Sequence, residues 1–370
     1  MFYLDSLHLK TFRNYNQQFL KLHPQLNVIT GENAQGKTNL IESIYYLSVT
    51  RSFRTNRDQE LAQYPGQSFL IKGVFVQEDL KHTVEINYDF NQLKVYVDGD
   101  LSKRYEHLQR FPVIIFSPDD LLIIREGPAT RRKFINLEAS RLSRVYFSDL
   151  KAYHRILIQR NQLLKQLWGR KKADSLLETW DENLVKYGSK IISFREKLIR
   201  DLEREVKPFF SLMTGEKEEL ELEYVSSFPF SQSDQGLENT FREALSEKRE
   251  QEYRRQSTAV GPHLDDVRIM INGFDSRKYS SQGQKRTAAL ALKMAEVNLF
   301  SQKLDERPII LLDDVFSELD LFRKEELFNF LSVAKGQCFL TTALDLDGLR
   351  SHIGNDLKIL MVKEGIINSE

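Results

Sequence analysis

The stretch Gly31-Glu-Asn-Ala-Gln-Gly36-Lys37-Thr38 decides how the rest of the chain is interpreted. It has the spacing of a phosphate-binding P-loop, in which glycines let the backbone wrap around phosphates and a lysine neutralises their charge. An apolar run, residues 26–30, precedes it, and residues 39–46 have helical spacing, so the loop is predicted to connect a strand to a helix. The residues expected to contact a nucleotide are Gly31, Glu32, Asn33, Ala34, Gln35, Gly36, Lys37 and Thr38.

A second motif stands near the end of the chain, where the apolar residues 309–312 are followed by Asp313 and Asp314. The pattern predicts a buried strand with carboxylates at its carboxyl end, which is where open α/β sheets bind ligands. With the P-loop it predicts an ATPase site, in which Thr38 and Asp313 hold Mg²⁺. Lys37 is expected to reach the β- and γ-phosphates, and Asp314 to orient or deprotonate the attacking water.

The loop Tyr279-Ser-Ser281-Gln-Gly283-Gln284 precedes a predicted helix, residues 286–299. A Ser/Gly loop at a helix N-terminus binds anions, although on its own a plain helix cap explains it equally well. The order of phosphate loop, Ser-Gly-Gln loop and acidic strand is that of ABC ATPases, in which this loop closes on the γ-phosphate held by the other subunit. We therefore expect Ser281, Gly283 and Gln284 to contact nucleotide, with Ser281 taking part in catalysis.

Taken together, the motifs resemble the RecF family from end to end. The matching stretches follow a specific order: Thr11 to Tyr15, the P-loop, Ser52 to Arg54, Phe116 to Leu121, Gly127-Pro128 with Arg131-Arg132, Gly261 to His263 with Asp265-Asp266, the Ser281 loop, and Asp313 to Asp320. RecF proteins resemble the heads of SMC-type ATPases without their long coiled coils. The resemblance implies an α/β fold: an ABC/SMC-type P-loop ATPase head with an antiparallel β subdomain and an inserted helical arm domain.

The resemblance also implies a function, that of an ATP-dependent DNA-binding protein of recombinational DNA repair and replication. The family is linked to gap repair, to RecA loading with RecO and RecR, and to the SOS response. The implied partners are DNA (single-stranded, gapped or duplex), a second copy in an ATP-dependent head-to-tail homodimer, and RecR, with no membrane partner and a cytoplasmic, nucleoid-associated location. Arg13 and Asn14 are implied nucleotide contacts, with a plain surface turn as the alternative.

Three positions depart from the usual ABC pattern. Asp314 stands where glutamate is usual, no histidine lies beside residues 341–342, and Ser117 occupies the place of a glutamine after the strand predicted at 113–116. Each change removes or retracts a group that positions water, metal or γ-phosphate. We therefore expect a weak, DNA-stimulated ATPase that acts as a switch. The alternatives are a cassette ATPase coupled to another partner, such as a membrane transporter, and a nucleotide-binding scaffold.

The composition limits the possible partners. Lys plus Arg and Asp plus Glu both number 53, so the net charge is zero and any polyanion site must be a local patch. The single cysteine, Cys338, lies in a predicted buried strand; it excludes a disulfide within the chain and suits a reducing cytosol. We expect neither a secretory signal nor a membrane span, because no apolar run is long enough.

The length of 370 residues exceeds that of one compact domain. We predict a discontinuous ATPase head, residues 1–124 and 251–370, with an inserted helical arm domain at 125–250. Within the arm, residues 125–207 are predicted to form two long antiparallel helices, interrupted at 169–174 and closed by Pro208.

Two basic clusters of the arm are candidate DNA contacts. Arg131 and Arg132 lie at its base, and Arg170, Lys171 and Lys172 lie at its tip. For both clusters the alternative is a solvated helix surface.

His263, Asp265 and Asp266 have the composition of a metal site. No second histidine or cysteine accompanies them, so a hydrogen-bonded structural cluster is favoured.

Overall fold

The computed structural model describes residues 1–64, 67–89, 92–167, 174–230, 234–342 and 356–369. The chain divides into two compact units. Unit 1 comprises Met1–Asp120, Leu212–Gly215 and Leu290–Glu370, and unit 2 comprises Leu121–Ser211 and Glu216–Ala289. The boundaries that we predicted for the head and the arm stay a prediction.

Unit 1 contains a six-stranded sheet in the order β15-β14-β3-β13-β12-β8. Its strands are β3 (Leu26–Thr30), β8 (Val113–Phe116), β12 (Ile309–Leu312), β13 (Cys338–Thr342), β14 (Lys358–Lys363) and β15 (Ile366–Ser369). All neighbours pair in parallel except β14 and β15. β8, β12 and β13 are buried throughout, as is typical of parallel strands. Because β3 and β12 run parallel, the P-loop and Asp313 follow strands that end at the same edge.

A second six-stranded sheet in unit 1 is antiparallel, in the order β2-β1-β4-β5-β6-β7. Its strands are β1 (Tyr3–Phe12), β2 (Tyr15–Lys21), β4 (Phe69–Gln77), β5 (Leu80–Asp89), β6 (Gln92–Val97) and β7 (Asp100–Ser102). Asp98 and Gly99, a residue pair that favours a two-residue hairpin turn, both have positive φ and lie between the paired residues Val97 and Asp100. The antiparallel β subdomain expected from the resemblance is thus confirmed, although β2, which is rich in polar residues, was not predicted.

Helix α1 (Lys37–Val49) packs between the two sheets of unit 1. It contacts β4 and β5 of the antiparallel sheet and β8, β12 and β13 of the parallel one. Ten of its 13 residues are buried, so the helix lacks a solvent-exposed polar face, and the buried residues include Glu42 and two serines, Ser43 and Ser48. A buried carboxylate in such a helix requires partners, and these are described below. The short helices of unit 1 are η1 (Asp58–Leu61), η2 (Pro118–Asp120) and η3 (Val315–Glu318), followed by α10 (Leu321–Ala334).

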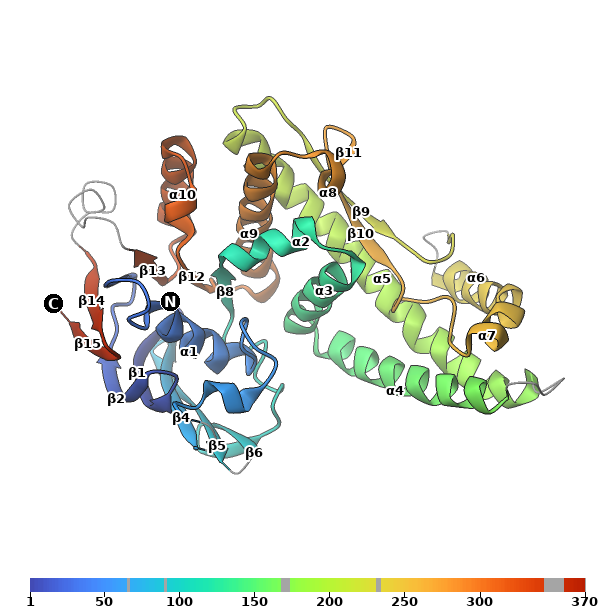
Figure 1. Ribbon diagram of the computed structural model, residues 1–370, viewed down its shortest axis with the longest axis horizontal. Coiled ribbons are helices and arrows are strands. Elements are labelled where there is room, and N and C mark those ends of the chain that lie inside the picture. The colour runs from blue at the N-terminus through green and yellow to red at the C-terminus, as the bar shows by residue number, and fades with distance from the viewer. Residues whose placement is uncertain (65–66, 90–91, 168–173, 231–233, 343–355, 370) are drawn as a thin grey trace. The chain divides into compact units, whose positions relative to one another are not determined.

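Unit 2 is mainly helical (Figure 1). Its helices are α2 (Leu121–Arg125), α3 (Pro128–Leu142), α4 (Arg144–Gln166), α6 (Asp234–Glu247), α7 (Arg249–Arg255) and α8 (Ser276–Tyr279), together with most of α5 (Asp174–Met213) and the start of α9 (Gln282–Leu304). A small antiparallel sheet in the order β11-β10-β9 consists of β9 (Leu220–Val225), β10 (Asp266–Ile271) and β11 (Phe274–Asp275). Helices α4 and α5 lie antiparallel, because Arg160 bonds to Asp181 whereas Tyr146 packs on Phe194.

The prediction of two long helices over residues 125–207 is wrong in two details. The chain breaks at Ser143, whose hydroxyl accepts a hydrogen bond from the Tyr146 amide and caps α4, so α3 and α4 are separate helices. Pro208 lies inside α5 and does not end it. It is exposed, and buried Phe210 and Met213 hold the last turn to the core. Within the described ranges, we find no helix that combines the length and the hydropathy needed to cross a membrane.

Candidate nucleotide-binding site

The P-loop connects β3 to α1 as predicted, and its shape depends on two glycines. Gly31 and Gly36 have φ values of 141° and 124°, which side chains rarely tolerate. A Cβ on Gly31 would also lie 2.3 Å from the carbonyl oxygen of Val362. The loop thus requires glycine at both positions, and the first turn of α1 carries no acidic side chain that would repel an anion.

The side chain of Lys37 folds back over this loop. Its Nζ donates hydrogen bonds to the carbonyl oxygens of Gly31 at 2.6 Å and Glu32 at 2.8 Å. The ammonium is thus held at the mouth of the loop, where a phosphate would compete with two neutral carbonyl groups for it.

The Thr38 hydroxyl donates a hydrogen bond to Oδ1 of Asp313 at 3.0 Å. Thr341, at the end of β13, donates to the same oxygen at 3.1 Å. Asp313 is 5% exposed, and burial raises its pKa against the opposing effect of these two hydroxyl groups. The structure thus places both predicted Mg²⁺ ligands together.

Asp314 differs from Asp313 in exposure and conformation. Its backbone is left-handed (φ 54°), its amide donates to Thr341 Oγ1 at 2.8 Å, and its side chain is exposed. The Thr341 hydroxyl therefore bonds to both acidic residues. Asp314 lies beside the Thr38–Asp313 pair and is free to face a bound molecule.

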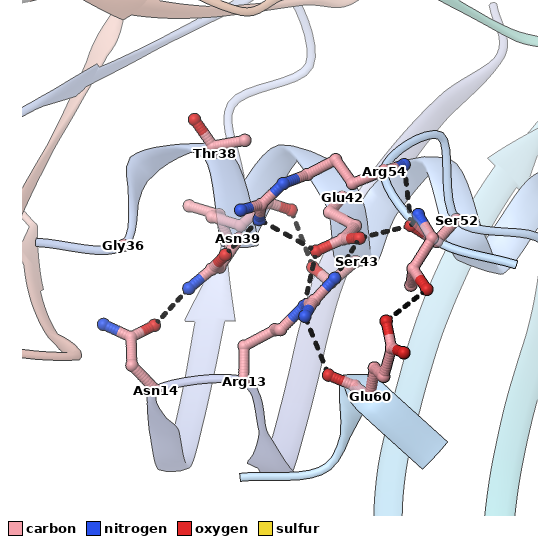
Figure 2. A network of polar contacts seen from close by, with 12 residues as sticks. Arg13, Asn14, Gly36, Thr38, Asn39, Glu42, Ser43, Ser52, Arg54 and Glu60 are labelled. Atoms are coloured by element: carbon pink, nitrogen blue, oxygen red, sulfur yellow. Dashed lines mark hydrogen bonds and ion pairs between the residues drawn. The ribbon is translucent and has the colours of Figure 1, made fainter. Parts of the chain in front are cut away.

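Asn14 contacts both the P-loop and α1, and Figure 2 shows its bond to Asn39. Its Nδ2 donates to the carbonyl oxygen of Gln35 at 2.7 Å, and its Oδ1 accepts from Asn39 Nδ2 at 2.8 Å. Tyr15 donates through its hydroxyl to the carbonyl oxygen of Gly36 at 2.8 Å. The turn between β1 and β2 thus fixes the loop backbone. In this structure the side chain of Asn14 bonds to Gln35 and Asn39.

Arg13 is held by acceptors in the protein (Figure 2). Its Nε and Nη2 donate to the two carboxylate oxygens of Glu42, each at 2.8 Å, and Nη1 donates to the carbonyl oxygen of Glu60 at 2.7 Å. Arg54 donates to Oε2 of Glu42 at 3.3 Å and to Oδ1 of Asn39 at 2.7 Å. Arg13 therefore joins the β1–β2 turn to α1. Its predicted contact with a nucleotide stays a prediction.

The turn of the β14–β15 hairpin also contacts the P-loop, through hydrogen bonds to Gln35. The amide of Glu364 donates to Oε1 of Gln35 at 2.6 Å, and the amide of Gly365 donates to its carbonyl oxygen at 3.2 Å. Gln35 therefore has its side chain and its main chain fixed, while Glu32, Asn33 and Ala34 are exposed.

The Ser281 loop belongs to unit 2 and starts α9. The Gln284 amide donates to Ser281 Oγ at 3.2 Å, and the Ser281 amide donates to Gln284 Oε1 at 2.7 Å, which is a reciprocal helix cap. The side chain of Gln284 also donates to Glu218 at 2.6 Å. Ser281 and Gly283 are exposed, so the loop is firmly held and open to a ligand from outside.

The predicted DNA contacts have different surroundings. Arg131 is buried and donates twice to Asp266, at 2.8 Å each, and once to the carbonyl oxygen of Glu126 at 2.6 Å. Arg132 is half-buried and donates to the carbonyl oxygen of Asp265 at 2.8 Å. Arg131 thus forms a structural ion pair, a role that the sequence pattern did not indicate. Arg170, Lys171 and Lys172 lie outside the residues that the structure describes.

His263 and the acidic residues near it have separate partners. His263 Nδ1 accepts a hydrogen bond from the Tyr153 hydroxyl at 2.7 Å, and burial lowers the pKa of the imidazole to about 4. Asp265 is bound by the Tyr224 hydroxyl and by the Ser227 amide at 2.7 Å. The described part of the chain holds no cluster of three or more His, Cys, Asp or Glu side chains that could bind a metal. His263 and Asp265 are each held by hydrogen bonds within the protein, and the structural cluster stays a prediction.

Sequence reasoning missed Glu42, Thr341 and the position of Arg54. Glu42 belongs to an apolar helix, and its only visible signal is a carboxylate one helical turn after Thr38 on the same face. Thr341 lies at the strand end where a histidine was expected. Arg54 was named only within the matching stretch Ser52 to Arg54, yet its guanidinium bonds to Asn39 and Glu42 on α1.

The strand–P-loop–helix unit, the Thr38–Asp313 pair at the sheet edge and the capped Ser281 loop are the features of an ABC-type ATPase head. The family model of the RecF/RecN/SMC N-terminal domain matches residues 3–368. DNA replication and repair protein RecF of Staphylococcus aureus (strain JH9) is 38% identical over 369 residues, which covers 98% of this chain and 99% of the relative. This chain belongs to the RecF family of DNA replication and repair proteins.

Solved structures agree with this assignment. The structure of the recombination mediator protein RecF with ATP, in the RecFOR pathway, is 36% identical and has a TM-score of 0.91, covering 100% of this chain and 98% of that one. The Smc head domain of Pyrococcus furiosus, solved with the C-terminal domain of ScpA, has a TM-score of 0.57 at 15% identity, covering 100% of this chain and 96% of that one. The second likeness concerns the fold alone, and it agrees with the predicted ABC/SMC-type head.

Proposed function

We propose that the chain is an ATP-dependent DNA-binding protein of recombinational repair and replication, in which the nucleotide acts as a switch. The observation that carries the proposal is the Thr38–Asp313 hydrogen bond at 3.0 Å, which joins the P-loop to the acidic strand. Family membership supports the biological role, since the Staphylococcus aureus relative is named for DNA replication and repair and a solved relative is a recombination mediator bound to ATP.

ATP is the proposed ligand of the P-loop. The amides at the start of α1 face the phosphates, and Lys37 leaves the carbonyl groups of Gly31 and Glu32 for the β- and γ-phosphates. The exposed loop residues Glu32, Asn33 and Ala34 lie beside the nucleotide.

Mg²⁺ fits the site through Thr38 and Asp313. Their oxygens lie 3.0 Å apart, both are hard donors, and Mg²⁺ usually takes only one or two protein ligands beside phosphate and water. When bound, the ion neutralises charge that develops on the phosphates. Thr341 keeps Asp313 oriented through its 3.1 Å hydrogen bond.

Hydrolysis is proposed to be slow. Asp314 is exposed beside the metal ligands and orients or deprotonates the attacking water, but it is one methylene shorter than the usual glutamate. Arg54 is proposed to act as an arginine supplied in cis, because its exposed guanidinium is held at the start of α1 by Asn39. In a weak ATPase of this kind, the rate of hydrolysis sets how long the ATP-bound, DNA-binding state lasts.

A second copy of the chain is proposed to complete the site. The Ser281 loop presents an exposed serine and glycine at the N-terminus of a 23-residue helix, where an anion is stabilised. In a head-to-tail homodimer, Ser281, Gly283 and Gln284 of one copy contact the γ-phosphate held by the other. ATP then joins the two heads.

DNA and the proteins of the RecFOR pathway are the proposed partners of the ATP-bound dimer. We propose roles in gap repair, in RecA loading with RecO and RecR, and in the SOS response, carried out in the cytoplasm at the nucleoid. The proposed phosphate contacts are Arg132, Arg170, Lys171 and Lys172. Arg131, which is buried in its ion pair with Asp266, is the least suited of the predicted set.

The proposal is tested by measuring dimer mass and DNA affinity with and without ATP and Mg²⁺. We expect ATP to increase both, and the logarithm of the affinity to fall with the logarithm of salt concentration by about 0.9 per duplex phosphate neutralised. Nucleotide binding without any effect on DNA affinity or on dimerisation would favour a scaffold. Absence of DNA binding together with association with membranes would favour a cassette ATPase coupled to another partner.

A further inference from the structure

Glu42 is a buried carboxylate on which four donor groups converge. It is fully buried on α1, four residues after Thr38. Two donors come from Arg13, at 2.8 Å each, one from Arg54 at 3.3 Å, and one is the hydroxyl of Ser52. Figure 2 shows these side chains meeting at the carboxylate. Two guanidinium groups therefore share one buried negative charge.

Arg54 is fixed at both of its ends through Glu42. Its guanidinium donates directly to Glu42 and to Asn39. Its own amide donates to Ser52 Oγ at 2.9 Å, and the amide of Thr55 donates to the same oxygen at 3.0 Å. Because Ser52 in turn donates to Glu42, the loop that carries Arg54 is anchored to the same carboxylate as the guanidinium.

The direction in which Arg54 is held has a chemical consequence. Asn39 follows Thr38 directly, so the 2.7 Å bond from Arg54 to Asn39 keeps the guanidinium at the start of α1. This places the guanidinium one residue beyond Thr38, whose hydroxyl bonds to Asp313. With its side chain 41% exposed, Arg54 is accessible to a bound phosphate, whereas Arg13, at 18%, is enclosed.

We propose that Glu42 is a positioning residue for ATP hydrolysis, which acts by holding Arg54 and its loop at the phosphate side of α1. The assignment rests on the proposed ATPase function. Glu42 itself touches neither phosphate nor metal. Its effect on the reaction therefore depends on Arg54. If Glu42 only stabilised the fold through Arg13, removing Arg54 would not change the effect of a Glu42 substitution on the reaction.

A double-mutant cycle tests this route. Glu42→Gln is made in the parent chain and in an Arg54→Ala chain, and ATP affinity, kcat with DNA present, and thermal stability are measured for all four proteins. In the parent background we expect kcat to fall about 10-fold to 100-fold, as for other groups that orient a catalytic side chain, with ATP affinity changed less than about twofold. In the Arg54→Ala background, Glu42→Gln should change kcat less than about twofold.

Equal losses of kcat in both backgrounds would overturn the assignment, as would a loss confined to ATP affinity. Ser52→Ala is the second variant, because it frees the Arg54 loop without leaving a buried charge unpaired. It should lower kcat in the same direction, again only when Arg54 is present, and an unchanged kcat contradicts the proposal. A parent chain that binds no ATP would contradict the proposed function itself, and the role of Glu42 would fall with it.

Discussion

Thr38 and Asp313 are 275 residues apart in the chain, and their side chains meet in a hydrogen bond of 3.0 Å. The bond joins the end of the P-loop to the end of β12. Burial raises the pKa of Asp313, and the hydroxyl groups of Thr38 and Thr341 oppose that shift by favouring the carboxylate. The pair is thus held ready for a cation that would replace the hydroxyl proton as the partner of Asp313.

Thr38→Val keeps the branched shape and removes this oxygen. We expect ATP binding to persist through Lys37 and the loop amides, while the increase in affinity and turnover that Mg²⁺ provides falls by about tenfold or more. Titration of Mg²⁺ at fixed ATP measures the effect, with Thr38→Ser as the matched control that retains it. An unchanged Mg²⁺ dependence in the valine variant would show that Thr38 is not a metal ligand.

Lys37→Ala removes the ammonium that now bonds to Gly31 and Glu32. Hydrogen bonds to charged groups are each worth about 1.5–3 kcal/mol, so ATP affinity should fall about 10-fold to 100-fold. Lys81→Ala, at an exposed position of β5, is the control and should bind ATP as the parent does. Equal affinities of the parent and Lys37→Ala would contradict the predicted contact with the phosphates.

The parts of the fold that could be predicted are those whose local sequence pattern alone determines their structure. The P-loop, the 309–312 strand and the Asp98-Gly99 hairpin each carry their own signal, because glycine conformation and apolar runs act locally. The ion pair of Arg131 with Asp266 and the anchoring of two arginines on Glu42 depend on residues far apart in the chain. No spacing rule indicates which of several arginines will find a buried carboxylate, so these roles appeared only in the structure.

We expect the protein to lose unfolding free energy in mild acid because of the buried His107. The imidazole is 2% exposed, its Nε2 donates to the carbonyl oxygen of Leu47 at 3.0 Å, and burial lowers its pKa to about 4. The unfolded chain binds the proton with a pKa of about 6.5, so the contribution of neutral His107 is complete above that pH and is lost as the pH falls toward 4.

The size of this effect follows from the shift in pKa. Between about pH 7 and about pH 5, His107 should account for roughly 2 kcal/mol of lost unfolding free energy. Urea titrations of the parent and of His107→Gln measure it, and the glutamine variant should show the smaller pH dependence by that amount. Parallel pH profiles would mean that His107 titrates normally in the folded protein.

Arg131→Ala separates a structural role from a role in DNA binding. The side chain is 7% exposed and makes a bidentate pair with Asp266, so its loss should cost about 3 kcal/mol of unfolding free energy. Lys133→Ala on the same helix is exposed and should change stability by less than about 0.5 kcal/mol. If Arg131→Ala is as stable as the parent but binds DNA more weakly with a smaller salt dependence, then Arg131 contacts phosphate.

The central claim is that two heads close on ATP, each supplying a Ser281 loop to the other. Light scattering of three variants with ATP and Mg²⁺ tests it most directly. Ser281→Arg puts bulk and charge into the loop, so it should bind one ATP per chain and stay monomeric, whereas Ser281→Ala should still dimerise. Asp314→Asn keeps the shape of the site but removes the base, so ATP-bound dimers should accumulate. A Ser281→Arg chain that dimerises with ATP, or an Asp314→Asn chain that hydrolyses ATP at the parent rate, would contradict the account.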